Sequence, residues 1–247
     1  MTDSNNNIPS RDPANDDNMA GMFGNILQKF LQNVDDMLPA QIITFDRATN
    51  MATVQPLIKV VTTNGDTLSR PQIASVPVLQ IGGGGFVMNF NLKAGDFGYI
   101  KANDRDTSLL FQSNSEAAPN SKRKHSFEDG IFIPAVQSAF AINGEDGENA
   151  VFQNLAGTTR VAIWNDRVKI TVNGTDLILQ DGQLTIDATQ TTINGNLTVT
   201  GQTVLQGNVN AQANVAVGGN LTNAGTTYAT HKHGGVQSGN STTGAPQ

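Results

Sequence analysis

The stretch from Leu197 to Asn223, LTVTGQTVLQGNVNAQANVAVGGNLTN, decides the fold that the sequence predicts. Every second residue from Leu197 onward is mostly apolar or small, and the residues between them are mostly polar. This alternation is typical of a half-buried β-structure, and it lasts far longer than an ordinary strand of about five or six residues. A second pattern repeats Gly-Asn-Leu or Gly-Asn-Val every twelve residues, at Gly195, Gly207 and Gly219. We therefore expect a long, repetitive β-structure.

The same region is free of charge, since no Asp, Glu, Lys or Arg occurs from Ala188 to Thr230. A disordered tract can share this composition, but it has no reason to keep the alternation in phase through three repeats. A single-chain β-solenoid is a second alternative, but about two and a half repeats with small apolar residues are too few to enclose a core. Three identical chains wound about one axis solve the problem, because each apolar column then faces the other two and every backbone edge is paired. The sequence thus predicts an all-β protein with an intertwined homotrimeric β-helix, a needle.

Composition narrows the class of protein. The chain of 247 residues is long enough for two domains, and its net charge of -6 argues against a general nucleic-acid binder. The absence of cysteine excludes disulfides and thiolate metal sites. Residues 1–18 are polar and predicted to be disordered, without the pattern of a signal peptide, and no apolar run approaches the roughly twenty residues of a membrane span. We expect a protein that is made in the cytoplasm.

A short helix is predicted for residues 19–39. Phe23, Leu27, Phe30 and Val34 recur at alternating spacings of four and three, and Pro39 ends the pattern. The helix either packs on its own domain or forms a short seam between symmetry-related copies. Both interpretations remain open at this point.

Residues 40–138 hold most of the aromatic residues and at least five short strand patterns, which predicts a small Greek-key barrel of the OB type. Asn64-Gly65 predicts a tight hairpin, and Leu109–Phe111 is a further strand candidate. Gly82–Gly85 is interpreted as a hairpin tip, because a phosphate-binding loop requires a following Gly-Lys-Ser/Thr and a helix. The basic run Lys122–His125 is interpreted as a solvated loop.

A third β-region follows a junction at Ala139–Ala162, where an acidic cluster formed by Glu145, Asp146 and Glu148 is interpreted as a solvated turn. Beyond it, short apolar strands alternate with Asn173-Gly174 and Asp181-Gly182, which predicts an up-and-down meander.

Two histidines, His231 and His233, follow the needle pattern. Residues i and i+2 of an extended strand point to the same face, so both imidazoles are expected on one side. Around a threefold axis, three such pairs place six imidazoles as two stacked triangles, which is an octahedral set. Zinc in structural sites prefers four ligands, whereas ferrous iron, nickel or cobalt suit six imidazoles. Because the six imidazoles fill every coordination position, such a metal is structural, and it holds three chain ends together.

This order of parts resembles the central spike proteins of contractile-tailed bacteriophages. The resemblance rests on the OB-like barrel, the uncharged β-helix with its Gly-Asn repeats, the motif His231-Lys-His233-Gly-Gly, and the C-terminal sequence Ser241–Pro246 (STTGAP). It covers about Pro39 to the C-terminus.

The resemblance implies a structural protein of the virion that is assembled in the host cytoplasm and is no enzyme. It implies a homotrimer at the tip of the baseplate, attached to hub and tail tube proteins and driven through the host outer membrane when the sheath contracts, without nucleic acid. It further implies that His231 and His233 bind one iron (Fe²⁺) per trimer through six imidazoles. The expected parts are residues 1–18 (disordered), 19–39 (helix), 40–138 (barrel), 139–230 (trimeric shaft) and 231–247 (metal-binding apex).

Two other functions compete with this interpretation. A trimeric receptor-binding tail fibre or adhesin shares the β-helix but ends in a broad binding head, and only about fourteen residues follow His233. An enzyme acting on polysaccharide needs paired carboxylates beside a groove. The shaft offers Asp176, Asp181 and Asp187, each beside or near a turn, where Asp is common.

Overall fold

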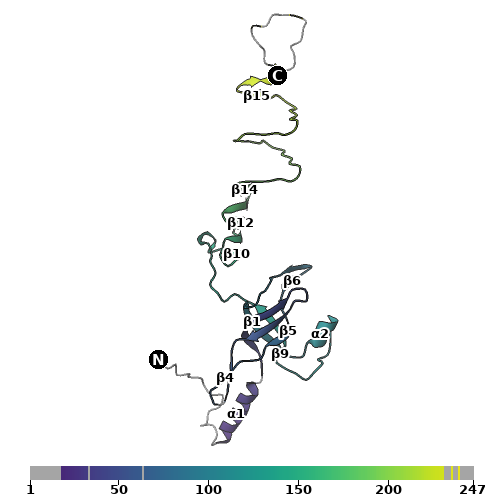
Figure 1. The fold of residues 1–247 in the computed structure, drawn as a ribbon, viewed down its shortest axis with the longest axis vertical. Helices are drawn as coiled ribbons and strands as arrows, with labels where there is room; N and C mark the ends of the chain where they lie inside the picture. Colours follow the sequence, from purple (N-terminus) through teal and green to yellow (C-terminus); the bar gives the residue numbers. More distant parts are fainter. Residues whose placement is uncertain (1–17, 33, 63, 231–234, 236–238, 240–247) are drawn as a thin grey trace, which may run out of the picture. The chain divides into compact units, whose positions relative to one another are not determined.

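Five strands form one sheet in the order β5-β2-β1-β8-β9. Figure 1 presents the structure, a computed structural model that describes residues 18–32, 34–62, 64–230, 235 and 239. The strands of this sheet are β1 (Met37–Asp46), β2 (Met51–Pro56), β5 (Ile73–Pro77), β8 (Phe97–Asn103) and β9 (Ser126–Pro134).

Parallel pairing just beyond β5 nearly closes this sheet into a barrel. Val78 forms a parallel bridge with Phe132 of β9, and the Leu79 N–H donates to the Phe132 carbonyl oxygen at 2.8 Å. All strand pairs within the sheet are antiparallel. Because β5 and β9 are the two outer strands, the parallel bridge connects the two edges of the sheet. This five-stranded arrangement confirms the predicted small barrel.

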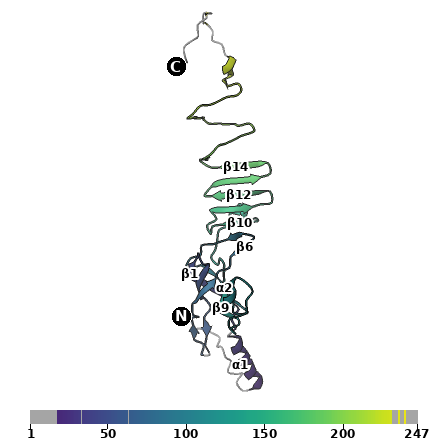
Figure 2. The same cartoon turned by 90° about the vertical axis from the view of Figure 1, so that its right-hand side faces the viewer.

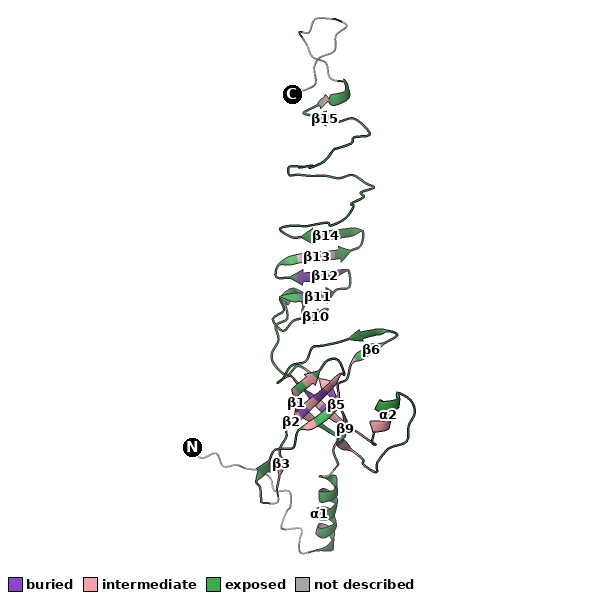
Figure 3. Ribbon diagram, turned by 45° about the vertical axis from the view of Figure 1, so that its right-hand side comes forward, coloured by how far each residue is buried: buried purple, intermediate pink, exposed green. Residues whose placement is uncertain are grey.

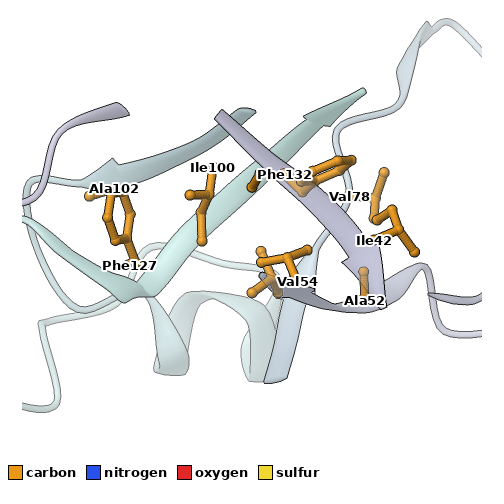
Figure 4. Close-up of a cluster of buried hydrophobic side chains, with 10 residues drawn as sticks. Ile42, Ala52, Val54, Val78, Ile100, Ala102, Phe127 and Phe132 are labelled. Carbon is orange, nitrogen blue, oxygen red and sulfur yellow. The ribbon is translucent and has the colours of Figure 1, made fainter. Parts of the chain in front are cut away.

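The barrel core consists of the inward residues of these alternating strands. Buried and half-buried positions alternate strictly along β2 and β8, as the period-2 rule requires when one face is packed. Figure 4 shows the side chains of the cluster converging between the strands. The largest fully buried apolar side chains are Phe132, Ile42, Ile100, Val54 and Val76.

Two small hairpins extend from the barrel strands, at the two places that the sequence predicts. β3 (Val60–Val61) pairs with β4 (Thr67–Leu68) around Asn64-Gly65. β6 (Ile81–Gly83) pairs with β7 (Phe86–Met88), and the turn residues Gly84 and Gly85 have φ of 59° and 88°. Both angles lie in the left-handed region that a two-residue type I′ turn needs and that glycine adopts freely.

The N-terminal helix α1 (Met19–Leu31) ends earlier than predicted. Asn18 caps it by accepting a hydrogen bond from the Gly21 N–H at 2.7 Å. The pattern that suggested a helix up to Pro39 is wrong beyond Leu31, because Met37 already belongs to β1. The reason is tertiary pairing: the Asp35 N–H donates to the His125 carbonyl oxygen at 2.9 Å, and Met37 pairs with Lys101. No residue of α1 is buried.

The strand predicted at Leu109–Phe111 is wrong, since these residues lie in helix α2 (Ser108–Ser113). A short apolar run does not distinguish helix from strand by its period. Here the Asp106 carboxylate accepts from the Ser108 N–H at 2.9 Å and starts the helix, and Asn114 ends it with a left-handed conformation. In the described ranges, neither α-helix reaches the length and apolarity needed to cross a bilayer.

Five further strands make the predicted antiparallel meander, in the order β10-β11-β12-β13-β14. Figure 3 shows them as successive rungs. The turns at Asn173-Gly174 and Asp181-Gly182 join β12 to β13 and β13 to β14, as expected. The strands are β10 (Ala150–Gln153), β11 (Thr159–Ile163), β12 (Arg167–Val172), β13 (Thr175–Gln180) and β14 (Gln183–Asp187).

Residues 189–247 form a separate unit, which we call the tail. Its strands among the described residues are β15 (Thr222–Asn223) and β16 (Thr226–Thr227), followed by a 3-10 turn, Tyr228–Thr230. Figure 2 shows the preceding residues as a trace without arrows.

Candidate functional site

The predicted metal ligands, His231 and His233, lie outside the described residues. The structure therefore describes the chain up to their immediate neighbour, Thr230, and not the site itself. In the part of the chain that is described, no group of three His, Cys, Asp or Glu side chains has the arrangement of a metal site. The two histidines stay a prediction from the sequence.

The described chain reverses direction just before these histidines. β15 and β16 pair through Thr222 with Thr227, and the turn residues Ala224 and Gly225 have φ of 47° and 82°. The Tyr228 N–H donates to the Leu221 carbonyl oxygen at 2.7 Å, which extends the hairpin by one bond. A local hairpin thus precedes the predicted apex.

The alternating segment of the tail makes no β-pairing of its own. From Thr189 to Asn220, all of which are described, no backbone hydrogen bond is found, and every residue is exposed. The apolar column lies open to solvent, with Val209 70% and Leu197 69% exposed. Figure 3 shows this stretch as uniformly exposed. Exposed apolar side chains are unfavourable in water, so the segment lacks apolar partners within the described part of its own chain.

The meander has one apolar face. Cross-strand partners in an antiparallel sheet share a face, so the register assigns each side chain to one side. One side carries two apolar rows, and many of their residues are more than one-third exposed. The rows are Phe152, Val161, Ile170, Leu177 and Ile186, and next to them Ile163, Val168, Leu179 and Leu184.

The opposite face of the meander carries a charged network covered by the 3-10 turn Gly144–Asp146. Asp146 is 1% exposed, and its carboxylate accepts from Arg160 Nε at 2.5 Å and from Trp164 Nε1 at 3.1 Å. Arg160 also donates to Glu145 at 2.5 Å. Lys169 donates to the same Glu145 oxygen at 2.9 Å. Glu145 and Asp146 were expected in a solvated turn, and this expectation is wrong for Asp146.

These pairs shift the ionisation of the network. The hydrogen bond from Lys169, followed by that from Arg160, holds the pKa of Glu145 below its usual range. The hydrogen bond with Glu145 raises the pKa of Lys169. Burial acts to lower the pKa of Arg160, but its bonds with Asp146 and Glu145 raise it on balance. All three groups are therefore charged at neutral pH. Sequence reasoning missed Arg160 and Lys169, because both occupy ordinary polar positions in the alternation of their strands.

Of the three carboxylates considered for an enzyme, Asp176 has its surroundings defined by the structure, and they do not favour a catalytic acid. Asp176 lies opposite Asp187 on the neighbouring strand, and Asp181 lies in the β13–β14 turn. Asp176 is paired with Lys169 at 3.0 Å. Burial acts to raise the pKa of Asp176, but the nearby Thr171 hydroxyl and the ion pair with Lys169 lower it on balance. A glycosidase acid needs a raised pKa, so Asp176 is poorly suited to that role.

The basic run Lys122–His125 lies in a loop, where Arg123 is held by acidic neighbours. Arg123 binds Asp129 at 2.8 Å and Glu128 at 3.2 Å. Its charge is thus paired with two carboxylates of β9.

The chain thus combines a nearly closed barrel, a meander with one apolar face, and a tail whose sequence alternates like a β-structure. Two segments of this chain match known protein families. Residues 38–135 match the family described as phage protein Gp138 N-terminal domain, and residues 227–247 match the GpV Apex motif. No curated protein matches the chain. The two matches, one on the barrel and one on the tail, support a baseplate spike protein of a phage and a location in the virion.

Proposed function

We propose that the protein is the central spike of a contractile-tailed phage baseplate and pierces the host outer membrane during tail contraction. The observation that carries the proposal is the Apex-motif match at residues 227–247, at the far end of a chain whose barrel matches a phage domain. We assign residues 40–138 to the barrel, 139–230 to the shaft and 231–247 to the apex.

The spike is a homotrimer. Two separate surfaces support this: the exposed apolar face of the meander and the exposed apolar column of the tail. Three copies cover each surface by facing one another, and pairing between chains satisfies the free backbone groups of residues 189–220. One chain alone leaves both surfaces in water.

The apex holds one Fe²⁺ per trimer through His231 and His233. The donor set fits this ion, because three pairs of neutral imidazoles provide six nitrogen ligands. The Apex motif also belongs to spike tips that bind metal in related proteins. The bound metal supplies a crosslink between three chain ends that otherwise fray. The role of the two histidines is to hold it and to keep the tip closed.

The uncharged shaft suits passage through a bilayer. A charged side chain in hydrocarbon costs a few kcal/mol or more, and Ala188–Thr230 contains no Asp, Glu, Lys or Arg. Backbone groups that are all paired between chains avoid a similar penalty. The exposed amides and hydroxyls favour a needle that is pushed across by an external force and does not reside in lipid.

The barrel end attaches the spike to the baseplate hub and tail tube, and the protein carries out no catalysis. A trimeric receptor-binding fibre is the second candidate, since it uses the same β-helix. The Apex-motif match at residues 227–247 favours the spike.

Elemental analysis of the purified protein tests the apex. We expect about one iron for every three chains, and its loss in the double variant His231→Ala plus His233→Ala. Lys232→Ala is the matched control, since its side chain points away from the imidazoles on an extended strand. Acid should release the metal as the histidines protonate, which begins as the pH falls toward about 6.5 or well below that value. Iron content that is unchanged in the double variant would contradict the site.

A further inference from the structure

The hairpin β6–β7 is an apolar arm, and every residue of its two strands is exposed in the described part of the chain. From Val78 to Leu92 there is no charged residue. Ile81 pairs with Met88 and Gly83 with Phe86, so Ile81, Phe86 and Met88 share one face of the hairpin. Phe86 is 84% exposed and Ile81 66%. A lone two-stranded hairpin is marginally stable in water, and an open apolar edge promotes association.

The base of this arm is fixed to the barrel by polar contacts. Gln80 Nε2 donates to Asn50 Oδ1 at 2.7 Å, in the turn between β1 and β2. On the other strand, Arg47 Nε donates to Asn89 Oδ1 at 3.0 Å. The arm therefore starts from a defined place on the barrel, and its tip turns through two glycines.

An apolar groove of about 740 Å³ lies beside the base of the arm. Its lining includes Phe90, Leu92, Phe97, Pro134, Val136 and Leu155. Asp96, the charged residue of the lining, accepts a hydrogen bond from the Lys93 N–H of its own loop at 2.7 Å. The groove thus offers a binding surface for apolar side chains. Its first lining residue, Phe90, follows the arm residue Met88 by two positions.

We propose that, in the trimer, the β6–β7 arm of each protomer seats its Ile81–Phe86–Met88 face in this groove of the next protomer. The inference rests on the homotrimer of the proposed function. A patch and a complementary groove on one chain make a head-to-tail contact, which closes into a ring when the copies are related by a rotation. One wall of the groove begins at Phe90, two residues after the arm ends at Met88, so the base of the arm and the groove adjoin on one protomer. Rotation about an axis leaves height unchanged, so the groove of the next protomer lies at the same height as the groove beside the arm. The ring of three arms adds to the contacts between the shafts and does not hold the trimer together by itself.

Disulfide trapping tests this contact, because the chain has no cysteine of its own. The double variant Phe86→Cys plus Val136→Cys should, on mild oxidation, join all three chains. We expect a species of three times the 26.1 kDa chain mass on a denaturing, non-reducing gel. The matched control is Val87→Cys plus Val136→Cys, in which the first thiol points to the opposite face of the same hairpin. The three-chain species should be lost in this control.

Native mass and Trp164 fluorescence, measured on the reduced variants, separate the outcomes. A trimer with parent-like fluorescence whose cysteines form no link between chains overturns the arm exchange and leaves the spike proposal standing; in that case the arm faces another baseplate component. Disulfides within single chains overturn it too. A parent protein that is monomeric overturns both proposals. As a second variant, Phe86→Asp should lower the heat-unfolding midpoint of the trimer more than Val87→Asp, and equal shifts would contradict the proposed face.

Discussion

The barrel and the tail use similar residues in opposite ways. In the barrel, Ile42, Val54 and Ile100 alternate with less buried residues and point into a core made by the same chain. In the tail, Leu197 and Val209 alternate just as regularly, yet they face solvent, and the backbone around them is unpaired. Alternation therefore identifies a β-structure in both regions, but it does not identify which chain completes it.

The difference follows from the local supply of large side chains and turns. The barrel region holds most of the aromatic residues, and Phe127 and Phe132 fill its centre. The tail has small apolar residues and cannot enclose a core from one copy. The meander is intermediate, because its strands pair within the chain while its apolar face stays open.

The largest expected effect is the loss of the trimer when a charge is introduced into the apolar column of the tail. Val209→Asp places three carboxylates face to face around the axis, where the like charges repel and are poorly solvated. We expect no trimer at micromolar concentration, measured by sedimentation, with the barrel still folded. Asn208→Asp is the control, since the neighbouring residue belongs to the polar column. Equal trimer content in the two variants would show that the column does not face other copies.

The charged network of the meander is expected to show the next largest effect. Arg160→Met leaves Asp146 buried without its main partner, and this should destabilise the meander by about 3–5 kcal/mol. Trp164, the single tryptophan, bonds to Asp146 and reports the urea midpoint of this region. Adding Asp146→Leu should recover part of the loss. The control Arg105→Met removes the exposed ion pair with Asp104 and should lower the free energy of unfolding by about 0–1 kcal/mol. A loss as large as that of Arg160→Met would contradict the role of burial.

A smaller effect distinguishes the barrel core from the tail. Ile100 is fully buried, and Ile100→Val should cost about 0.5–1.5 kcal/mol through one lost methylene. Hydrogen exchange of the barrel strands, followed by mass spectrometry, measures the loss. Val215→Ala in the tail should leave exchange in the barrel unchanged. If Val215→Ala loosens the barrel strands as much as Ile100→Val, the barrel is not self-sufficient.

The smallest expected effect is the pH dependence of the meander. Because the pKa of Glu145 is lowered in the fold, its stabilising contribution is present above its usual value of 4.5 and is lost as pH falls below that value. The pKa of Lys169 is raised, so its contribution is present below the usual value of 10.5 and is lost at higher pH. The urea midpoint read from Trp164 should fall at both extremes. Glu145→Gln should flatten the acid side, and an unaltered acid side would contradict the assignment.

Local signals predicted much of the fold. Asn173-Gly174, Asp181-Gly182 and Gly84-Gly85 each occupy a tight turn, and each pair supplies at least one residue in the left-handed region. The apolar alternation of β12 to β14 predicted the meander and the face on which its apolar residues lie. These signals depend on neighbours in the chain, which a sequence displays directly.

The errors arose where distant partners decide the structure. Asp35 is bound by Arg70 at 3.2 Å and by the Phe127 N–H at 3.3 Å, and this anchoring accompanies the early end of α1. Burial of Asp146 depends on Arg160 and Trp164 from later strands. The helical spacing of Val34 and the acidic turn were real patterns, but neither contains information about those partners. The two histidines of the apex remain a prediction for the same reason, since their proposed geometry comes from other copies.

The mass of the full-length protein in solution tests the central claim most directly. Native mass spectrometry should show three times the chain mass of 26.1 kDa, with about one additional iron ion bound per assembly. The barrel can fold as one chain, but the tail in this account cannot. A folded, monodisperse monomer at micromolar concentration would contradict the account, because the apolar column and the unpaired backbone of residues 189–220 would then have no partner.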